Sequence, residues 1–431
     1  MKFYSTNKKS PAVDFREATI KGQAPDRGLY FPEKVPTLSK SFIDQLNRMS
    51  KEDIAFRVIK PYVDESIADE DLYRIVSETV NFDFPLVKVD ESAYALELFH
   101  GPTLAFKDVG ARFMSRCLGY FSKDRKEKIF VLVATSGDTG SAVANGFYDV
   151  DGVEVIILYP SGKVSGVQEK QLTTLGKNIH SLEVDGTFDD CQKMVKQAFA
   201  DHDLTGKLFL TSANSINVAR WLPQQFYYFY ALRQWKHDQL PVICVPSGNF
   251  GNICAGLIAY KSGLPVKHFI AACNANDVVP EYFSQGEYHP KPAKATISNA
   301  MDVGDPSNFV RILELFNNEF GTLKELISSY SISDAETRKT IIDIKNKYNY
   351  LLDPHGAVAY ASVQRYLAEN KNDKTIFLET AHPIKFYDVV EPLINEKLPV
   401  PESLNELMTR KKVSTRISTY YTEFKEFLLN K

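Results

Sequence analysis

The sequence predicts an α/β fold with mostly parallel sheets. Short β-branched runs alternate with helical segments along the middle of the chain, as in AYALELF, KIFVLVA, VEVIILY, IHSLEV and PVICVP. This alternation is typical of parallel strands covered by helices on both faces. The chain has 431 residues, too many for one ordinary hydrophobic core, so we expect two or three lobes.

Four parts are expected along the chain. Residues 1–90 show helical spacing in SKSFIDQLNRM and ADEDLYRIVSETV, which predicts an N-terminal helical extension. Residues 91–238 are expected to form a smaller α/β domain. Residues 239–395 are expected to form a larger one that shares N-terminal segments. Residues 396–431 predict a polar, helical tail.

Individual elements follow from periodicity and capping residues. Helices are predicted over roughly 106–121, 165–175, 189–202, 252–262, 308–348 and 355–369. A further helix is predicted to begin at Thr139, and one long helix is predicted to begin near Ser215. Residues 275–306 contain five prolines and little periodicity, which predicts an irregular loop.

Composition excludes several classes of function. The net charge of -3 gives no general attraction to nucleic acid or membrane. The five cysteines form no CxxC pair, and no His, Cys, Asp or Glu cluster has metal-ligand spacing, so neither a disulfide framework nor a metal site is expected. The apolar runs are too short to cross a bilayer, and the opening residues do not resemble a signal peptide. These features favour a cytoplasmic protein.

Ligands of α/β proteins bind where strands end, and one such end carries Lys107. In ELFHGPTLAFKDVGARF a strand ends, a Gly-Pro turn follows, and Lys107 opens the next helix. The positive end of a helix dipole lowers the pKa of a lysine, which suits an amine that forms a Schiff base. The alternative is a solvated lysine whose stem packs on Phe106.

Two further strand ends are rich in glycine and small polar residues. In VLVATSGDTGSAVANGF, hydroxyls and free backbone N–H groups favour an anion or a carboxylate, although an ordinary capped turn is equally compatible. In VICVPSGNFGNICAGL, two glycines allow close backbone approach to a ligand at a helix start. Neither a Walker loop nor GxGxxG is present, so a phosphate monoester is favoured over a nucleotide; a tight turn without ligand is the alternative.

Two other segments carry candidate polar residues. LETAHPIKF places Thr380 and His382 after a strand, where the threonine is able either to bond a heteroaromatic nitrogen or to cap a turn. SANSINVARW carries Asn214, Ser215, Asn217 and Arg220, for which helix capping beside a surface arginine is the alternative. His355 is interpreted as a helix-start residue.

Together these segments resemble the threonine synthases of the bacterial and fungal type. HGPTLAFKD, ATSGDTGSA, SANSINVAR, VPSGNFGN, SNAMDVGDPSN and TAHPIKF occur in the family's order, and GLYFPE extends the likeness toward the N-terminus. The resemblance implies the tryptophan-synthase-β-like fold of fold-type-II pyridoxal-phosphate enzymes, with a cofactor cleft between two α/β domains.

The resemblance also implies roles for particular residues. Lys107 would be the Schiff-base lysine and general base, Thr380 would face the pyridine nitrogen, and the cofactor phosphate would be cupped by Gly248, Asn249, Phe250, Gly251 and Asn252. Asp138 departs from related enzymes of this fold, which have an asparagine there. It is interpreted either as a contact to the cofactor's 3′-hydroxyl or as loop support.

The family's reaction turns O-phospho-L-homoserine and water into L-threonine and phosphate. A second phosphate site is therefore expected, and its candidates are Ser136, Thr139, Asn214, Ser215, Asn217 and Arg220, with Lys163 and Lys170 as weaker ones. A phospho-lyase that releases a 2-oxo acid, and a non-catalytic ligand-binding homologue, stay open as alternatives. A monomer or a small homo-oligomer is expected.

Overall fold

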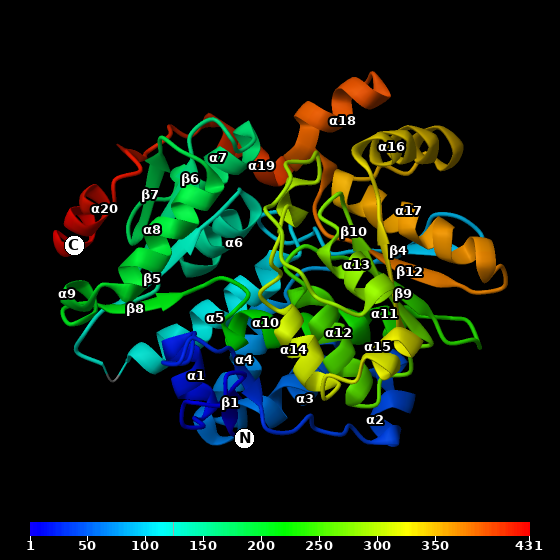
Figure 1. Cartoon of the computed structure of the whole chain (residues 1–431), viewed down its shortest axis with the longest axis horizontal. Coiled ribbons are helices and arrows are strands. Elements are labelled where there is room, and N and C mark those ends of the chain that lie inside the picture. Colours follow the sequence, from blue (N-terminus) through cyan, green and yellow to red (C-terminus); the bar gives the residue numbers. More distant parts are fainter. Residues whose placement is uncertain (124) are drawn as a thin grey trace.

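A computed structural model describes residues 1–123 and 125–431 and shows two lobes, each built on a parallel sheet (Figure 1). The larger sheet has six strands in the order β11 (Ile327–Ser331), β10 (His268–Cys273), β9 (Val242–Pro246), β12 (Thr375–Glu379), β4 (Ala93–Glu97) and β3 (Leu86–Lys88). All neighbours in it are parallel except β3 and β4. The expected α/β class with mostly parallel sheets is confirmed.

The smaller sheet has five strands, and all of its pairs are parallel. Their spatial order is β13 (Thr415–Ile417), β7 (Ile179–Val184), β6 (Val153–Pro160), β5 (Ile129–Ala134) and β8 (Phe209–Ser212). Every residue of β5 is buried, as its uninterrupted apolar sequence IFVLVA predicts for a strand covered on both faces.

Helices cover both sheets. Those of the smaller lobe are α5 (Lys107–Ser122), α6 (Asp138–Phe147), α7 (Gly166–Thr173), α8 (Phe188–Ala200) and α9 (His202–Thr205). Those around the larger sheet are α11 (Gln225–Gln234), α12 (Gly251–Lys261), α13 (Val278–Gln285), α14 (Phe309–Leu315), α15 (Phe320–Leu326), α16 (Asp334–Tyr348), α17 (Pro354–Glu369) and α18 (Tyr387–Ile394). Side-chain caps start many of them, with full capping boxes at Ser165, Thr187 and Ser333.

The N-terminal region is mainly helical and lies below both lobes in the view of Figure 1. It contains α1 (Phe15–Lys21), α2 (Lys40–Asp44), α3 (Lys51–Val63), α4 (Asp69–Thr79), two short 3-10 turns, η1 (Leu46–Arg48) and η2 (Asp64–Ser66), and the antiparallel pair β1 (Phe3–Ser5) and β2 (Tyr30–Pro32). Helix α1 contacts α5, and α3 contacts α11, so this region joins the two lobes from one side.

Sheet membership differs from the expected domain limits. Strand β4 falls inside the expected smaller domain, 91–238, but it pairs with β12 in the larger sheet. Strand β13 lies in the expected tail, 396–431, and forms the edge of the smaller sheet. The chain therefore begins the larger sheet, leaves to build the smaller lobe, and returns. Periodicity identifies a strand but does not identify its partner, so the sequence alone did not assign β4 and β13 to their sheets.

Three predicted elements also differ. The long helix expected from Ser215 is three pieces, α10 (Val218–Trp221), η3 (Leu222–Gln224) and α11, with Pro223 at the start of η3. The expected loop 275–306 contains α13 and the 3-10 turn η4 (Asn299–Met301). The helical stretch expected over 308–348 is interrupted by β11.

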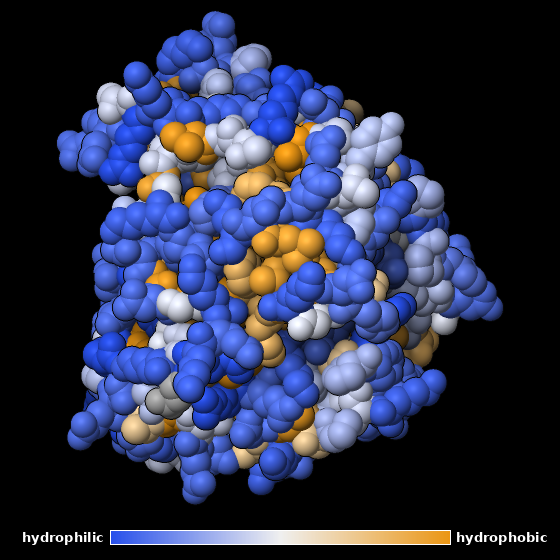
Figure 2. Space-filling model, turned by 90° about the vertical axis from the view of Figure 1, so that its left-hand side faces the viewer, coloured by the Kyte–Doolittle hydropathy of each residue, from blue (hydrophilic) through white to orange (hydrophobic). Residues whose placement is uncertain are grey.

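The C-terminal residues form α19 (Glu402–Thr409), β13 and α20 (Tyr421–Leu429), and they lie on the smaller lobe (Figure 1). Figure 2 shows this side of the molecule as a mainly hydrophilic surface with separate hydrophobic patches. In the described part of the chain, no helix is both long enough and apolar enough to span a membrane.

Candidate active site

Lys107 lies at the start of α5, and the end of β12 fixes the loop before it. The Phe106 N–H donates to the Thr380 carbonyl at 2.9 Å, and the His382 N–H donates to the Leu104 carbonyl at 3.0 Å. An antiparallel bridge joins Ala105 to Ala381. Residues distant in sequence are thereby brought together, and Thr380 lies beside the segment that carries Lys107.

The surroundings of Lys107 lower the pKa of its amine. The side chain is half-buried, and its Nζ lies 5.6 Å from the centre of the Phe106 ring. Loss of hydration on burial is the main cause of the lower pKa, and the cations Lys385 and Arg220 add to it. The carboxylates of Asp138 and Asp353 oppose the shift. The alternative of a solvated surface lysine does not describe this environment.

The glycine-rich loop after β9 has the backbone geometry of an anion cradle. Phe250 adopts a left-handed conformation with φ of 59°, and Gly251 then begins α12. A Cβ added at Gly248 would lie 2.6 Å from the Met301 Cα, so only glycine allows this close approach. A phosphate fits the N–H groups exposed at such a helix start.

Side chains from two other segments hold this loop. The Asn249 Nδ2 donates to the Ser215 Oγ at 2.9 Å, and its Oδ1 accepts from the Ser307 N–H at 2.7 Å. The Asn308 Nδ2 donates both to the Ser215 Oγ and to the Asn249 carbonyl, at 3.1 Å each. Ser215, predicted as a substrate residue, therefore contacts the loop that the sequence predicts to hold the cofactor phosphate. Ser307 and Asn308 were missed as site residues, although the DPSN motif that contains them is part of the resemblance.

Asn252 completes the loop and leaves a donor free. Its Oδ1 and its carbonyl both accept from the Tyr228 hydroxyl, at 2.9 and 2.8 Å. Among the described residues its buried Nδ2 has no hydrogen-bond partner. An unpartnered buried donor beside a helix start is compatible with a bound anion.

Arg220 is buried, with 3% of its surface exposed, so the alternative of a surface arginine is wrong. Its Nη1 donates to the Lys107 carbonyl at 3.0 Å, and its Nε has no partner in the described part of the chain. Burial lowers the pKa of its guanidinium to about 10, so it stays charged at neutral pH. Arg220 therefore holds a positive charge and a free donor next to Lys107.

The other substrate candidates have different surroundings. Asn217 caps α10: its Oδ1 accepts from the Ala219 N–H at 2.9 Å and its Nδ2 donates to the Thr19 carbonyl at 2.8 Å. This is the capping alternative, and it leaves the side chain fully buried. Asn214 keeps a buried Oδ1 that has no partner among the described residues.

The loop before α6 is shaped by Thr135, whose Oγ1 accepts from the N–H groups of Gly137 at 3.0 Å and of Gly140 at 2.9 Å. Ser136 and Thr139 are half-buried on this loop. Of the weaker candidates, Lys163 is exposed.

Lys170, the other weaker candidate, donates to the Arg410 carbonyl in the C-terminal segment. This contact ties α7 to the tail and engages the Lys170 amine away from the glycine-rich loops.

Asp138, the first residue of α6, is buried and paired with a lysine that the sequence interpretation did not single out. Its Oδ1 lies 2.8 Å from the Lys385 Nζ and accepts from the Gln168 Nε2 at 2.9 Å. Burial alone raises the pKa of this carboxyl, but Lys385 and Lys107 outweigh burial and hold the pKa well below its ordinary value. Lys385 belongs to the TAHPIKF segment, and its place in that segment is the one feature of the sequence that could have marked it as a site residue.

The end of β12 carries further buried polar residues. His355 is a helix-start residue, as expected: its Nε2 accepts from the Ala300 N–H at 3.2 Å and its Nδ1 pairs with Asp353. Burial and the neighbouring Asp353 raise the pKa of Glu379 well above its ordinary value. His382 caps the 3-10 turn η5 (Pro383–Phe386).

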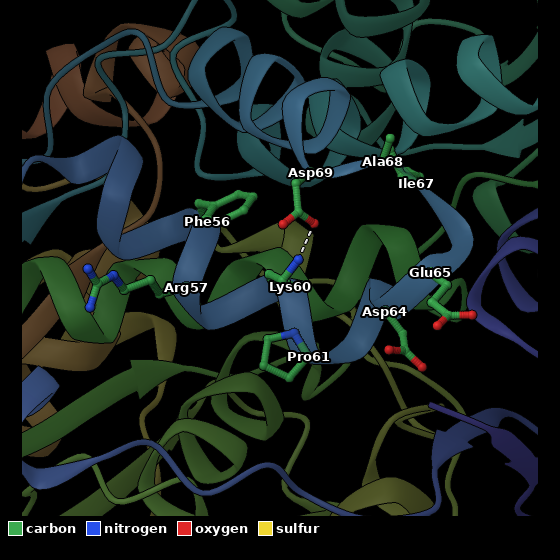
Figure 3. Close-up of a pocket in the computed structure, with 9 residues that line it drawn as sticks. All are labelled: Phe56, Arg57, Lys60, Pro61, Asp64, Glu65, Ile67, Ala68 and Asp69. Carbon is green, nitrogen blue, oxygen red and sulfur yellow. Dashed lines mark hydrogen bonds and ion pairs between the residues drawn. The ribbon is translucent and has the colours of Figure 1, made fainter.

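A surface pocket of about 420 Å³ lies between α3 and α4, and none of the predicted site residues lines it (Figure 3). Lys60 and Asp69 pair across it.

Three family models match the chain in succession. "Threonine synthase N terminus" matches residues 2–80, "Pyridoxal-phosphate dependent enzyme" matches residues 79–380, and "Threonine synthase, C-terminal" matches residues 356–428. The chain belongs to the threonine synthase family. The expected family, the fold type and the dependence on pyridoxal phosphate are confirmed by these matches.

Full-length relatives agree with this membership. Threonine synthases of Haemophilus influenzae and Escherichia coli are 43% and 41% identical to the chain, and each alignment covers all of both proteins. The crystal structure of the Escherichia coli threonine synthase superposes with a TM-score of 0.92 over 100% of both chains. A pyridoxal-phosphate-bound threonine synthase from Brucella melitensis, 34% identical, superposes with a TM-score of 0.93 over 100% of this chain and 99% of its own.

Proposed function

We propose that this threonine synthase converts O-phospho-L-homoserine and water into L-threonine and inorganic phosphate. The proposal rests on one observation: Lys107 and Arg220, whose side chains differ in chemistry, lie close together at the start of α5. Lys107 is an amine of lowered pKa, and Arg220 is a buried guanidinium without a carboxylate partner in the described part of the chain. A substrate with an amino group and a phosphate suits this pair.

The described residues fit pyridoxal phosphate. The glycine at position 248, the left-handed Phe250 and the free Asn252 donor suit its phosphate. Lys107 would hold its aldehyde carbon, and Thr380 would lie at its ring nitrogen. When bound, the cofactor supplies a ring that delocalises the negative charge left at the α-carbon of an amino acid.

Lys107 would act as the proton carrier of the reaction. Its lowered pKa favours the neutral amine relative to an ordinary lysine, and a neutral Nζ is able to take the proton from the substrate α-carbon. The same atom would later return a proton when the product forms. The Lys107 side chain would thus both remove and return the proton, so no second base would be needed for these steps.

Arg220 would bind the substrate phosphate. A guanidinium donates two parallel hydrogen bonds to a phosphate and remains charged throughout, so it is able to hold both the ester and the departing phosphate. Ser136, Thr139 and the Asn214 amide are proposed to add neutral contacts. Asn217 is the weakest member of the predicted set, because its donor and acceptor are already engaged in capping.

Product analysis tests the proposal. The holoenzyme is incubated with O-phospho-L-homoserine while phosphate, threonine and 2-oxobutyrate are measured together. Equal release of threonine and phosphate supports the synthase reaction, and 2-oxobutyrate with ammonia supports the phospho-lyase. Lys107→Ala is expected to lower turnover by about 10²–10⁴-fold or more, since a general base is lost. Lys371→Ala, which changes an exposed lysine that is not a site candidate, is the matched control. Absence of turnover in the unaltered protein supports the non-catalytic alternative.

We propose in addition that the enzyme works in the cytoplasm as a monomer or small homo-oligomer, without nucleic-acid or membrane partners. The balanced charge of -3 and the small-molecule substrate favour this setting. Size-exclusion chromatography with light scattering would give its oligomeric state.

A further inference from the structure

Lys385 is a fully buried cation that no step of the proposed reaction uses. Its side chain is 0% exposed, and its Nζ lies 2.8 Å from the Asp138 Oδ1 and 2.8 Å from the Thr103 carbonyl. An ammonium removed from water in this way is costly unless a counter-charge and hydrogen bonds compensate for the lost hydration. Asp138 is that counter-charge.

The pair is held from several elements at once. The Gln168 Nε2 on α7 donates to the same Oδ1 of Asp138 at 2.9 Å. The Gln171 Nε2, one turn further along α7, donates to the same Thr103 carbonyl as Lys385, at 3.1 Å. No described residue donates a hydrogen bond to the second oxygen of Asp138, Oδ2. One carboxylate oxygen is therefore anchored, and the other is left free.

Several charged groups face this pair. Lys107 at the start of α5 and Lys385 in η5 both lower the pKa of Asp138. Asp108 on α5, whose pKa burial raises, also faces Lys385. Arg220 on α10 and Asp353 before α17 act on Lys107. Of these groups, only Lys385 contacts the Asp138 carboxylate directly.

We propose that Lys385 is a positioning residue that keeps Asp138 ionised and fixed beside Lys107, so that a carboxylate with one free oxygen faces the cofactor. The asparagine of related enzymes of this fold would need no counter-ion, because an amide carries no charge. The aspartate at position 138 and the buried lysine at 385 thus form one unit. The inference rests on the family's cofactor and not on the identity of the substrate.

The pH titration of the bound cofactor's visible absorbance tests this inference in the holoenzyme. In the unaltered protein, Asp138 titrates far below the working range, so it contributes no inflection there. Lys385→Met removes the cation that contacts Asp138 and leaves only Lys107 to oppose burial, so the pKa of Asp138 rises. We expect an acid-side inflection that the unaltered protein lacks, because the loss of one nearby opposite charge raises a carboxyl pKa by about 1–3 units and burial adds to that rise. Lys385→Arg is expected to restore the original profile.

Two controls separate this role from simple packing. Gln168→Leu removes a neutral donor from the same Oδ1, and it is expected to shift the inflection much less than Lys385→Met. The double variant Asp138→Asn, Lys385→Met has no carboxyl at 138, and the new inflection should disappear. The double variant is also expected to be more heat-stable than Asp138→Asn alone, which leaves Lys385 buried without a counter-charge.

The inference is overturned if Lys385→Met shows no new inflection, or if the same inflection persists in the double variant. Should Lys385→Met not fold, Lys385→Gln serves instead, because a glutamine is uncharged and still able to donate to the Thr103 carbonyl. Since no substrate is added, a failure of the proposed reaction leaves this result unaffected.

Discussion

At the residue scale, the two buried cations near Lys107 differ in what neutralises them. Lys385 has the Asp138 carboxylate at 2.8 Å. Arg220 bonds only to a backbone carbonyl, the Lys107 oxygen, and keeps an unpartnered Nε within the described part of the chain. A buried charge without a counter-ion costs folding free energy, so an anionic ligand that pairs with Arg220 gains binding energy from it.

Replacement of Arg220 should weaken the use of substrate. We expect Arg220→Ala to lower kcat/KM for O-phospho-L-homoserine by about 10–100-fold, because charge-assisted hydrogen bonds contribute about 1.5–3 kcal/mol. Arg220→Lys should recover little, since an ammonium does not reproduce the two-point contact of a guanidinium. Steady-state kinetics of phosphate release would measure both.

Arg338→Ala, which removes an exposed arginine on α16, is the control for this prediction. Unchanged kinetics in Arg220→Ala would show that the substrate phosphate binds elsewhere, with Ser136, Thr139 and Asn214 as the remaining candidates.

We predict that His382 stabilises the folded protein at neutral pH and that this stabilisation is lost in acid. Burial lowers the pKa of His382 to about 4, and its Nδ1 accepts from the Ile384 N–H at 3.1 Å, which requires an unprotonated atom. The unfolded chain binds the proton near its ordinary pKa of about 6.5, so this stabilisation is present above pH 6.5 and is lost as the pH falls toward 4.

We expect a loss of about 1–2 kcal/mol in the free energy of unfolding across that window, after allowance for the partial exposure of the ring. Urea unfolding at several pH values would measure it. His382→Asn should flatten the slope, whereas His289→Asn, which changes an exposed histidine, should not. An identical slope in both variants would contradict the assignment.

Most of the proposed site was predictable from local motifs, because Lys107, Thr380 and residues 248–252 lie at strand ends within distinctive segments. Lys385 was not, since its proposed role depends on Asp138, which lies far away in the sequence. The positions of Ser215 and Asn308 at the phosphate loop likewise depend on tertiary contacts that no local pattern records.

At the element scale, the turn between β9 and α12 depends on backbone geometry more than on side chains. Gly248 lies against the backbone of Met301, and Phe250 has a positive φ. Such strained turns persist where the surrounding structure holds them, here through Asn249 and Asn308.

Gly248→Ala should therefore reduce cofactor affinity. The added Cβ would lie 2.6 Å from the Met301 Cα and 3.1 Å from the Ala300 carbonyl oxygen, so the loop must move. We expect at least about a tenfold rise in the dissociation constant of pyridoxal phosphate, equivalent to about 1.4 kcal/mol, measured by equilibrium dialysis. Gly321→Ala is the matched control, since nothing lies within 4 Å of a Cβ there. Equal affinity in both variants would contradict the role of this close approach.

Element prediction succeeded for buried strands and failed at sheet edges. IFVLVA and TIFLE are apolar throughout, and both are strands in the structure. The missed strands of the two large sheets are β3, β8, β11 and β13, with the sequences LVK, FLTS, ISSYS and TRI, and they are the outermost strands of their sheets. Edge strands are commonly short and polar, so their sequences lack the apolar signal of a central strand.

At the scale of the whole molecule, the chain crosses between the lobes more than once. It begins the larger sheet with β3 and β4, builds the smaller lobe from α5 to β8, and returns at β9. The C-terminal residues leave the larger lobe after α18. Helix α19 then contacts α7, and the chain ends on the smaller lobe as β13 and α20. The order of elements along the sequence does not reveal this last crossing.

The C-terminal segment should therefore stabilise the smaller lobe specifically. Phe424 on α20 is fully buried in a cluster with residues of the smaller lobe, and α20 contacts α8. Phe424→Ala removes a large buried ring, a change that typically costs about 3–5 kcal/mol. Because the affected contacts belong to one lobe, we expect faster amide hydrogen exchange in β7 and α8, with β9 and β12 unchanged.

Leu429→Ala, at a side chain that is 40% exposed on the same helix, is the control and should leave exchange in both lobes close to that of the unaltered protein. If Phe424→Ala accelerated exchange equally in β7 and β9, the two lobes would unfold as one cooperative unit. In that case the C-terminal segment would act on the whole fold and not on the smaller lobe alone. We expect faster exchange in the smaller lobe alone because β13 and α20 join that lobe last along the chain, and β13 is only the edge strand of its sheet.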